Sequence, residues 1–204
     1  MTSENTKIFI IDDDESVRRS FSLLLKSAGY VVEAFDGGDH FLALEQFNGI
    51  GCILLDIFLD GKSGLELQEQ VSKKFPALPI IYISGQGNIP MSVQALRKGA
   101  INFLQKPVDE INLFGAVEEA IEASRIKVSL GEEVNRIKLL MQSLTPREHE
   151  IYHLLITGLL NKQIAAKLNI AEHTVKIHRG KITEKLGVKS VVEMVQMAAL
   201  LNNR

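Results

Sequence analysis

Residues 7–14, Lys-Ile-Phe-Ile-Ile-Asp-Asp-Asp, place a short apolar run directly before three carboxylates. The run has the length and the β-branched content of a buried strand, and the apolar residues from Val17 to Ala28 then recur at helical spacing. The same order of strand and helix repeats four more times. We expect strands at 31–35, 52–55, 80–83 and 101–104, and helices at 38–47, 64–74, 90–98 and from about 109. Five such units predict an α/β fold with a doubly wound parallel sheet.

Polar residues stand at the carboxyl ends of these predicted strands. Asp12 and Asp13 follow the first strand, Asp56 the third, Ser84 the fourth and Lys106 the fifth. Strand ends of a doubly wound sheet meet at one edge, where ligands bind. Carboxylates that lie together repel one another unless a cation joins them, and hard oxygen ligands suit Mg²⁺. The pattern predicts a Mg²⁺ site beside which Asp56 attacks phosphorus, Lys106 balances charge and Ser84 donates a hydrogen bond.

Residues 7 to about 122 resemble a response-regulator receiver domain, so we expect this domain to span residues 1–122. The resemblance rests on the acidic pair Asp12–Asp13, on Asp56, and on Ser84 and Lys106 in order along the chain. It implies that Asp56 accepts a phosphoryl group from a sensor histidine kinase and that Lys106 and Ser84 assist. Two further implications follow: Ser84 and Phe103 switch the conformation, and Asp12, Asp13, Asp56 and the backbone carbonyl of Phe58 hold the metal.

Three positions bear on how this site behaves. Asp60 stands where many receivers have proline and places another carboxylate near Asp56. Phe58 and Gln86 stand two residues after Asp56 and Ser84, where receivers tune the access of water to the phosphoryl group. The lifetime of an aspartyl phosphate is therefore left open by the sequence.

Residues 123–143 are expected to form a helical linker. Apolar residues recur at spacings of three and four from Val134 to Leu144, and Gly131 is the position at which we expect a bend. The pattern before Gly131 is too irregular for the sustained heptads of a coiled coil, so a packed or partly exposed connector is favoured.

Residues 144–204 are expected to form a small four-helix domain. Thr145-Pro-Arg-Glu148 has the composition of a capping box with proline at the first helical position. A second helix is expected to be capped by Asn161 and a third to run from Glu172 to Leu186, with Ala171 as a poor cap. A fourth helix is expected at 191–201.

The third of these helices carries cations on the face opposite its apolar residues. Residues 129–204 hold 11 Lys and Arg against 7 Asp and Glu, whereas residues 1–128 hold 12 against 18, so the basic charge is concentrated where this helix lies. The second helix of a helix-turn-helix enters the major groove, where cationic side chains reach guanine edges or phosphates. The candidate DNA-binding residues are Lys162, Thr174, Lys176, Ile177, Arg179, Gly180, Lys181, Lys185 and Lys189.

The second domain resembles the LuxR-type helix-turn-helix. The residues that carry this resemblance are 144–148, 161–165 and 174–186. With the receiver they give the arrangement of FixJ/NarL-type regulators, and residues 87–91 favour the FixJ-like branch, which includes regulators of aromatic-hydrocarbon degradation. The resemblance implies binding of double-stranded promoter DNA, base contacts by Lys176, Ile177, Arg179 and Gly180, and a dimer contact through 191–201. It also implies homodimerisation on phosphorylation or on DNA binding, contact with RNA polymerase and activation of transcription.

Two other functions compete with this interpretation. The receiver could be a scaffold whose DNA-binding partner domain acts without phosphorylation, although such variants usually lose an acidic or lysine residue that is retained here. A phosphatase acting on external phosphomonoesters is disfavoured, because Phe58 replaces the general acid that such enzymes carry two residues after the nucleophile. We therefore expect no enzymatic activity beyond phosphoryl transfer to and from Asp56.

Composition indicates a cytoplasmic protein without a membrane partner. No apolar run approaches the roughly 18 residues of a membrane span, and residues 1–7 lack the pattern of a signal peptide. Cys52 is the single cysteine, so no internal disulfide can form.

Overall fold

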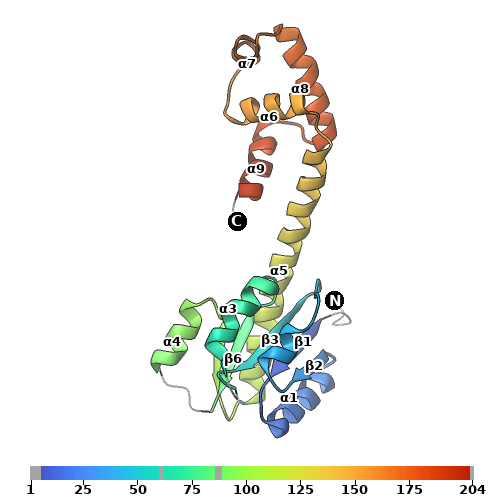
Figure 1. Cartoon of the computed structure of the whole chain (residues 1–204). Coiled ribbons are helices and arrows are strands. Elements are labelled where there is room, and N and C mark those ends of the chain that lie inside the picture. Colours follow the sequence, from blue (N-terminus) through green and yellow to red (C-terminus); the bar gives the residue numbers. More distant parts are fainter. Residues whose placement is uncertain (1–5, 60–61, 86–88, 203–204) are drawn as a thin grey trace. The chain divides into compact units, whose positions relative to one another are not determined.

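The computed structural model describes residues 6–59, 62–85 and 89–202 of the 204-residue chain. The chain divides into two compact units, Met1–Ser129 and Leu130–Arg204, and helix α5 (Glu110–Gln142) contributes to both (Figure 1). The division falls inside the predicted linker 123–143, and the domain limits at 122 and 144 stay predictions. No helix in the described part of the chain is long and apolar enough to cross a membrane.

The first unit is built on one five-stranded parallel sheet, which confirms the predicted doubly wound fold. The strand order is β2-β1-β3-β6-β7, so the order along the chain reverses between β1 and β3, at the point where such sheets bind ligands. The strands are β1 (Lys7–Ile11), β2 (Val31–Phe35), β3 (Gly51–Asp56), β6 (Ile80–Ser84) and β7 (Asn102–Gln105).

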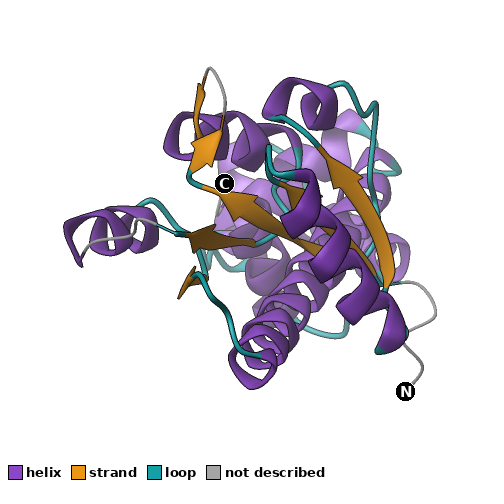
Figure 2. Ribbon diagram, turned by 90° about the horizontal axis from the view of Figure 1, so that it is seen from below, coloured by secondary structure: helices purple, strands orange, loops and turns teal. Residues whose placement is uncertain are grey.

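Successive side chains of β1 point to opposite faces of the sheet, so the core of this unit has two layers. Phe9 and Ile11 pack on one face of the sheet with side chains of α2, α3 and α4. Ile8 and Ile10 pack on the other face with side chains of α1 and α5. Figure 2 shows helices on both sides of the strands. The helices are α1 (Glu15–Ser27), α2 (Gly38–Leu42), α3 (Gly64–Lys74) and α4 (Ile89–Arg97), together with the first part of α5.

The predicted helix over 38–47 was too long. Helix α2 ends at Leu42, and residues 44–48 have no regular structure. Leu44 and Phe47 still pack against the core, and the Phe47 ring meets the Phe9 ring edge-on at 5.0 Å between centroids. The apolar residues of this segment therefore reach the core without a helix.

A short antiparallel hairpin follows the third strand and was not predicted. It pairs β4 (Phe58–Leu59) with β5 (Lys62–Ser63), directly before α3. Asp60 and Gln86, which the sequence singled out near Asp56 and Ser84, lie outside the described residues.

The second unit is helical. Its helices after α5 are α6 (Pro146–Ile156), α7 (Asn161–Leu168), α8 (Glu172–Leu186) and α9 (Val191–Asn202). The predicted capping box of α6 is present, with the Thr145 and Glu148 side chains each accepting from the backbone of the other residue. Helix α5 stays helical through Gly131, the predicted bend.

Asn161 was wrongly predicted as the cap of the second helix. The cap is Leu160, whose N–H donates to Oε1 of Gln163 at 2.8 Å, and Asn161 is the first helical residue. The turn to α8 passes through Asn169 in a left-handed conformation, with φ 52°. Asn is among the few residues that adopt this conformation at low cost, so the chain reverses there without glycine.

Candidate acidic pocket and DNA-binding face

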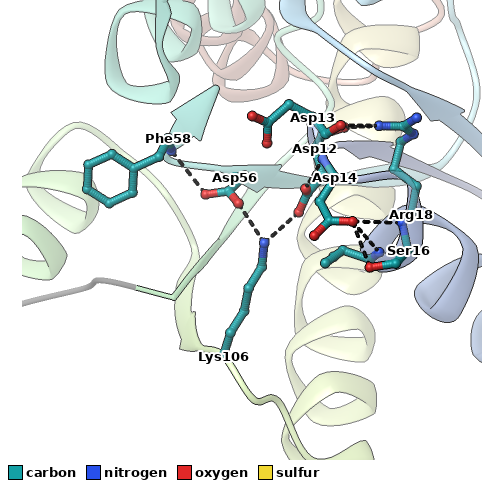
Figure 3. Close-up of polar contacts among 9 residues, drawn as sticks. Asp12, Asp13, Asp14, Ser16, Arg18, Asp56, Phe58 and Lys106 are labelled. Carbon is teal, nitrogen blue, oxygen red and sulfur yellow. Dashed lines mark hydrogen bonds and ion pairs between the residues drawn. The ribbon is translucent and has the colours of Figure 1, made fainter. Parts of the chain in front are cut away.

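Three carboxylates meet at the carboxyl ends of β1 and β3. Asp12 and Asp13 follow β1, Asp56 ends β3, and one oxygen of each lies within 4.8 Å of the others (Figure 3). They border a pocket of about 340 Å³, which is also lined by Asp14, Phe58, Gly85 and Lys106. The reversal in strand order thus places the predicted metal-binding carboxylates at one edge of the sheet.

Lys106 joins two of these carboxylates. It follows β7 and precedes Pro107 through a cis peptide bond. Its Nζ lies 2.7 Å from Oδ2 of Asp12 and 2.6 Å from Oδ2 of Asp56. Asp12 and Asp56 are buried, with 3% and 7% of their surface exposed, whereas Asp13 is exposed. Lys106 therefore pairs with two of the three carboxylates, Asp12 and Asp56.

Burial and charge act in opposite directions on these groups. Burial raises the pKa of Asp12 above its usual value, although the hydrogen bond from Lys106 works against that shift. For Lys106 burial alone would lower the pKa, but the hydrogen bonds to Asp12 and Asp56 outweigh it and raise the pKa. Lys106 stays protonated, and the remaining negative charge favours a further cation.

Two residues near the acidic pair, Asp14 and Arg18, stabilise the backbone of the loop between β1 and α1 through hydrogen bonds. The Asp14 carboxylate caps α1, accepting from the N–H and the hydroxyl of Ser16 at 2.7 Å, and these bonds lower its pKa. Arg18 donates from Nη1 to the backbone carbonyls of Asp12 and Asp13, at 2.7 and 2.8 Å. Arg18 was not among the predicted site residues, although its position one turn after the Asp14 cap directs its side chain back toward the loop.

The backbone around Asp56 is closely packed. The N–H of Phe58 donates to Oδ1 of Asp56 at 3.0 Å, and the N–H of Gly64 donates to the carbonyl of Ile57 at 2.8 Å. A Cβ on Gly64 would lie 2.4 Å from the Asp56 carbonyl oxygen, so only glycine fits there. The role of the Phe58 carbonyl as a metal ligand stays a prediction.

The two predicted switch residues lie on β6 and β7, which are neighbouring strands of the sheet. Ser84 ends β6, is fully buried, and accepts from the Lys106 N–H through its backbone carbonyl at 2.9 Å. Phe103 on β7 is half-buried and packs against the core that contains α3 and α4. The Ser84–Lys106 hydrogen bond links the end of β6 to a residue that lines the pocket. The predicted movement of Ser84 and Phe103 stays a prediction.

Helix α8 presents a polar face that matches the predicted DNA-binding residues. Val175, Ile182 and Leu186 are buried in the core of the second unit. Lys176 and Ile177 are exposed. The remaining candidates comprise exposed Lys162, Gly180, Lys181 and Lys189 and half-buried Thr174 and Arg179. The predicted DNA contacts themselves are untested.

Lys185 has another partner. Its Nζ donates to Oε2 of Glu148 at 2.6 Å and to the Ser143 carbonyl at 3.0 Å, and Glu148 is only 3% exposed. The hydrogen bond from Lys185, followed by that from the Thr145 N–H, lowers the pKa of Glu148 to about 2. The ion pair gives Lys185 a structural role, because its loss would leave a buried carboxylate without its charged partner. The phosphate contact of Lys185 stays a prediction.

Both halves of the chain match protein-family models. Residues 8–118 match the response regulator receiver domain, and residues 142–198 match the bacterial regulatory proteins of the luxR family. The two matches cover the acidic pocket and the helices of the second unit respectively.

Proteins similar over the whole chain share both parts. Nodulation protein W of Bradyrhizobium diazoefficiens is 39% identical over 98% of this chain and 89% of its own length. The response regulator protein TodT of Pseudomonas putida is 36% identical over 100% of this chain and 89% of its own length. A solved structure of the response regulator StyR is 41% identical, with a TM-score of 0.79, and the match covers 96% of this chain and 98% of that one.

Proposed function

The chain belongs to the two-component response regulators that join a receiver domain to a LuxR-type DNA-binding domain, and we propose that phosphorylation of Asp56 switches its binding to promoter DNA. A sensor histidine kinase is the phosphoryl donor, and the regulator acts in the cytoplasm. The proposal rests above all on Lys106, which bridges buried Asp12 and Asp56 at 2.7 and 2.6 Å.

The donor set of the pocket fits Mg²⁺. Three carboxylate oxygens from Asp12, Asp13 and Asp56 lie within 4.8 Å of one another, and hard oxygen ligands of this kind suit a small divalent ion. The backbone carbonyl of Phe58 is the fourth proposed ligand. When bound, the ion neutralises the negative charge that gathers on the phosphoryl oxygens.

Each residue of the pocket has a separate role in the proposed phosphoryl transfer. An Asp56 carboxylate oxygen attacks the phosphorus of the kinase phosphohistidine; the P–O bond forms while the P–N bond breaks, and the departing imidazole keeps the electron pair. Lys106 stays protonated and stabilises the charge on the transferred group. The Phe58 N–H already donates to an Asp56 oxygen, which holds the carboxylate in one orientation.

The phosphoryl group then acts on the surface of α4 and β7. Ser84 turns toward the phosphoryl group, and Phe103 follows into the vacated space. The changed surface pairs two chains into a two-fold dimer, which presents two α8 helices to half-sites about one helical turn apart. The bound dimer contacts RNA polymerase and activates transcription.

We further propose that the chain has no turnover on external substrates. Phe58 lines the pocket beside Asp56 and is 47% exposed, where a phosphatase of this chemistry would need an acidic side chain to protonate the leaving group. Phosphoryl transfer and hydrolysis at Asp56 are then steps of signalling.

Intact-protein mass spectrometry tests the chemical part of this proposal. Wild type and Asp56→Asn are incubated with acetyl phosphate and Mg²⁺, and each is also run on size-exclusion chromatography. The proposal predicts one phosphoryl group on the wild type alone, lost when the metal is chelated before incubation, together with a shift to dimer. Equal labelling of both proteins, or none in either, would contradict Asp56 as the acceptor.

A further inference from the structure

Two polar side chains lie inside the apolar core between β6, α3 and α4. Tyr82 on β6 is fully buried, and Gln68 on α3 is 1% exposed. The side chains around them are apolar, among them Leu67, Val71 and Ala95. Buried polar groups are costly unless their hydrogen bonds are satisfied, so such a pair in a core usually has a specific set of partners.

The partners form a chain of hydrogen bonds. The Tyr82 hydroxyl lies 2.9 Å from the Gly64 carbonyl and 3.0 Å from Oε1 of Gln68, and its single proton is shared between these two acceptors. Nε2 of Gln68 donates to the Lys98 carbonyl at 2.9 Å. Burial raises the pKa of Tyr82, so the hydroxyl keeps its proton and remains a donor. We call this arrangement the Tyr82–Gln68 bridge.

One end of the bridge lies at the loop that carries Asp56. Gly64 begins α3, and its N–H closes this loop on the Ile57 carbonyl at 2.8 Å. There is no room for a side chain on Gly64, because a Cβ would meet the Asp56 carbonyl oxygen at 2.4 Å. A shift of the Asp56 backbone is therefore passed to Gly64 by direct contact.

The other end lies at the C-terminal end of α4. Lys98 directly follows α4, and besides its carbonyl, its Nζ lies 3.1 Å from Glu69 and 3.3 Å from the Leu65 carbonyl on α3. The contact with Glu69 is at the surface, where 64% of the Glu69 side chain is exposed, so water competes for it. The bond from Gln68 is a buried hydrogen bond that ties Lys98, directly after α4, to α3. Figure 1 labels α3, α4 and β6 in this unit.

We propose that Gln68 is a positioning residue, which through the Tyr82–Gln68 bridge makes the end of α4 move with the Asp56 loop when the pocket is occupied by a phosphoryl group. This inference rests on the proposed function, because it assigns a route by which that site reaches α4. Packing of the core alone does not require the polar groups of Tyr82 and Gln68, since two apolar side chains of similar volume would fill the same space. The hydroxyl joins β6 to α3 at Gly64 and Gln68, and the amide joins α3 to Lys98, directly after α4.

Hydrogen exchange on the full chain, with beryllofluoride and Mg²⁺ as the phosphoryl mimic, tests the proposal. In the wild type, the mimic should change the exchange rates of residues 56–64 and of residues 95–100 together. Gln68→Met keeps the length of the side chain and removes its amide. In this variant the Asp56 loop should still respond, while the response at 95–100 falls about threefold or more.

Two further variants separate coupling from stability. Tyr82→Phe removes the hydroxyl and keeps the ring, so it should weaken the coupled response while α4 stays attached to α3 through Gln68. Glu69→Gln changes the exposed contact with Lys98 and should leave both responses at their wild-type values. If Gln68→Met fails to fold, Tyr82→Phe alone decides.

The outcomes distinguish this inference from the function on which it rests. Full responses at both segments in Gln68→Met and in Tyr82→Phe would overturn the coupling and leave the proposed function standing. A wild type that responds at neither segment would overturn the proposed function, and the coupling with it. Loss of the response at 95–100 alone, in the bridge variants but not in Glu69→Gln, is the result that we expect.

Discussion

Replacing Lys185 by methionine is expected to destabilise the Leu130–Arg204 unit by about 2 kcal/mol at neutral pH. The pair to be broken joins Nζ of Lys185 to Oε2 of Glu148 at 2.6 Å, with Glu148 only 3% exposed. Glu148 titrates at about 2 instead of at its ordinary 4.5. At about 1.4 kcal/mol per pKa unit, that shift corresponds to an upper limit of about 3.5 kcal/mol.

Two features reduce this upper limit. A third of the Lys185 side chain is exposed, so solvent screens its charge. The Glu148 carboxylate also keeps its hydrogen bond from the Thr145 N–H at 2.8 Å when Lys185 is gone. Both effects lower the expected loss to about 2 kcal/mol, which for a unit of this size corresponds to roughly 10 °C in melting temperature.

The pH dependence follows from the same pair. The folded-state pKa of Glu148 is lowered, so its contribution to stability is complete above about pH 4.5 and is lost as the pH falls toward 2. In Lys185→Met the pKa of Glu148 should rise toward its ordinary value. The stability of this unit should then depend less on pH between 4.5 and 2 than it does in the wild type.

Hydrogen exchange of α6 and α8 peptides in the full chain measures this loss without requiring the two units to unfold together. Lys181→Met is the matched control, because Lys181 is an exposed lysine on the same helix, and it should change stability by less than about 0.5 kcal/mol. Equal stability of Lys185→Met and Lys181→Met at pH 7 would refute the structural role assigned to Lys185.

Three further predictions concern the pocket and α8. Arg18→Met removes the bonds to the Asp12 and Asp13 carbonyls and should weaken Mg²⁺ binding roughly tenfold in calorimetric titration; a loss of the same size in Arg19→Met, on the same helix, would contradict this. Arg179→Ala should cost about 1–3 kcal/mol of specific DNA binding and relax the preference at one base position; a uniform loss on all duplexes would instead indicate a phosphate contact. Gly180→Ala, at a helical position with nothing within 4 Å of the added Cβ, should stabilise the second unit by about 0.5–1 kcal/mol in urea unfolding, and a destabilised variant would show that the space is not open.

The strands and the strand-end residues were accessible from sequence because each depends on local pattern. A buried parallel strand needs a continuous apolar run, and Asp12 and Asp56 stand directly after such runs. Once the sheet is doubly wound, these ends must meet. The same logic placed α8 correctly from Glu172 to Leu186, since Gly187 ends it in a left-handed conformation.

Other features were missed because they depend on contacts between distant segments. Residues 38–47 have the apolar content of a longer helix, but Phe47 reaches Phe9 from irregular chain. Lys185 has the composition of a surface lysine, and only the fold brings it to Glu148, 37 residues away. Gln68 and Tyr82 likewise have polar side chains that acquire partners only when α3, β6 and α4 assemble. The spacing of residues along the sequence does not predict which distant residues come into contact.

The measurement that tests the central claim most directly is DNA binding before and after phosphorylation. A duplex selected by the protein from a random pool is titrated by fluorescence anisotropy at fixed salt, with wild type and Asp56→Asn each incubated with acetyl phosphate and Mg²⁺. We predict that phosphorylation tightens binding by the wild type at least tenfold and leaves Asp56→Asn unchanged. Equal affinity of phosphorylated and unphosphorylated wild type would contradict control of the second unit by Asp56.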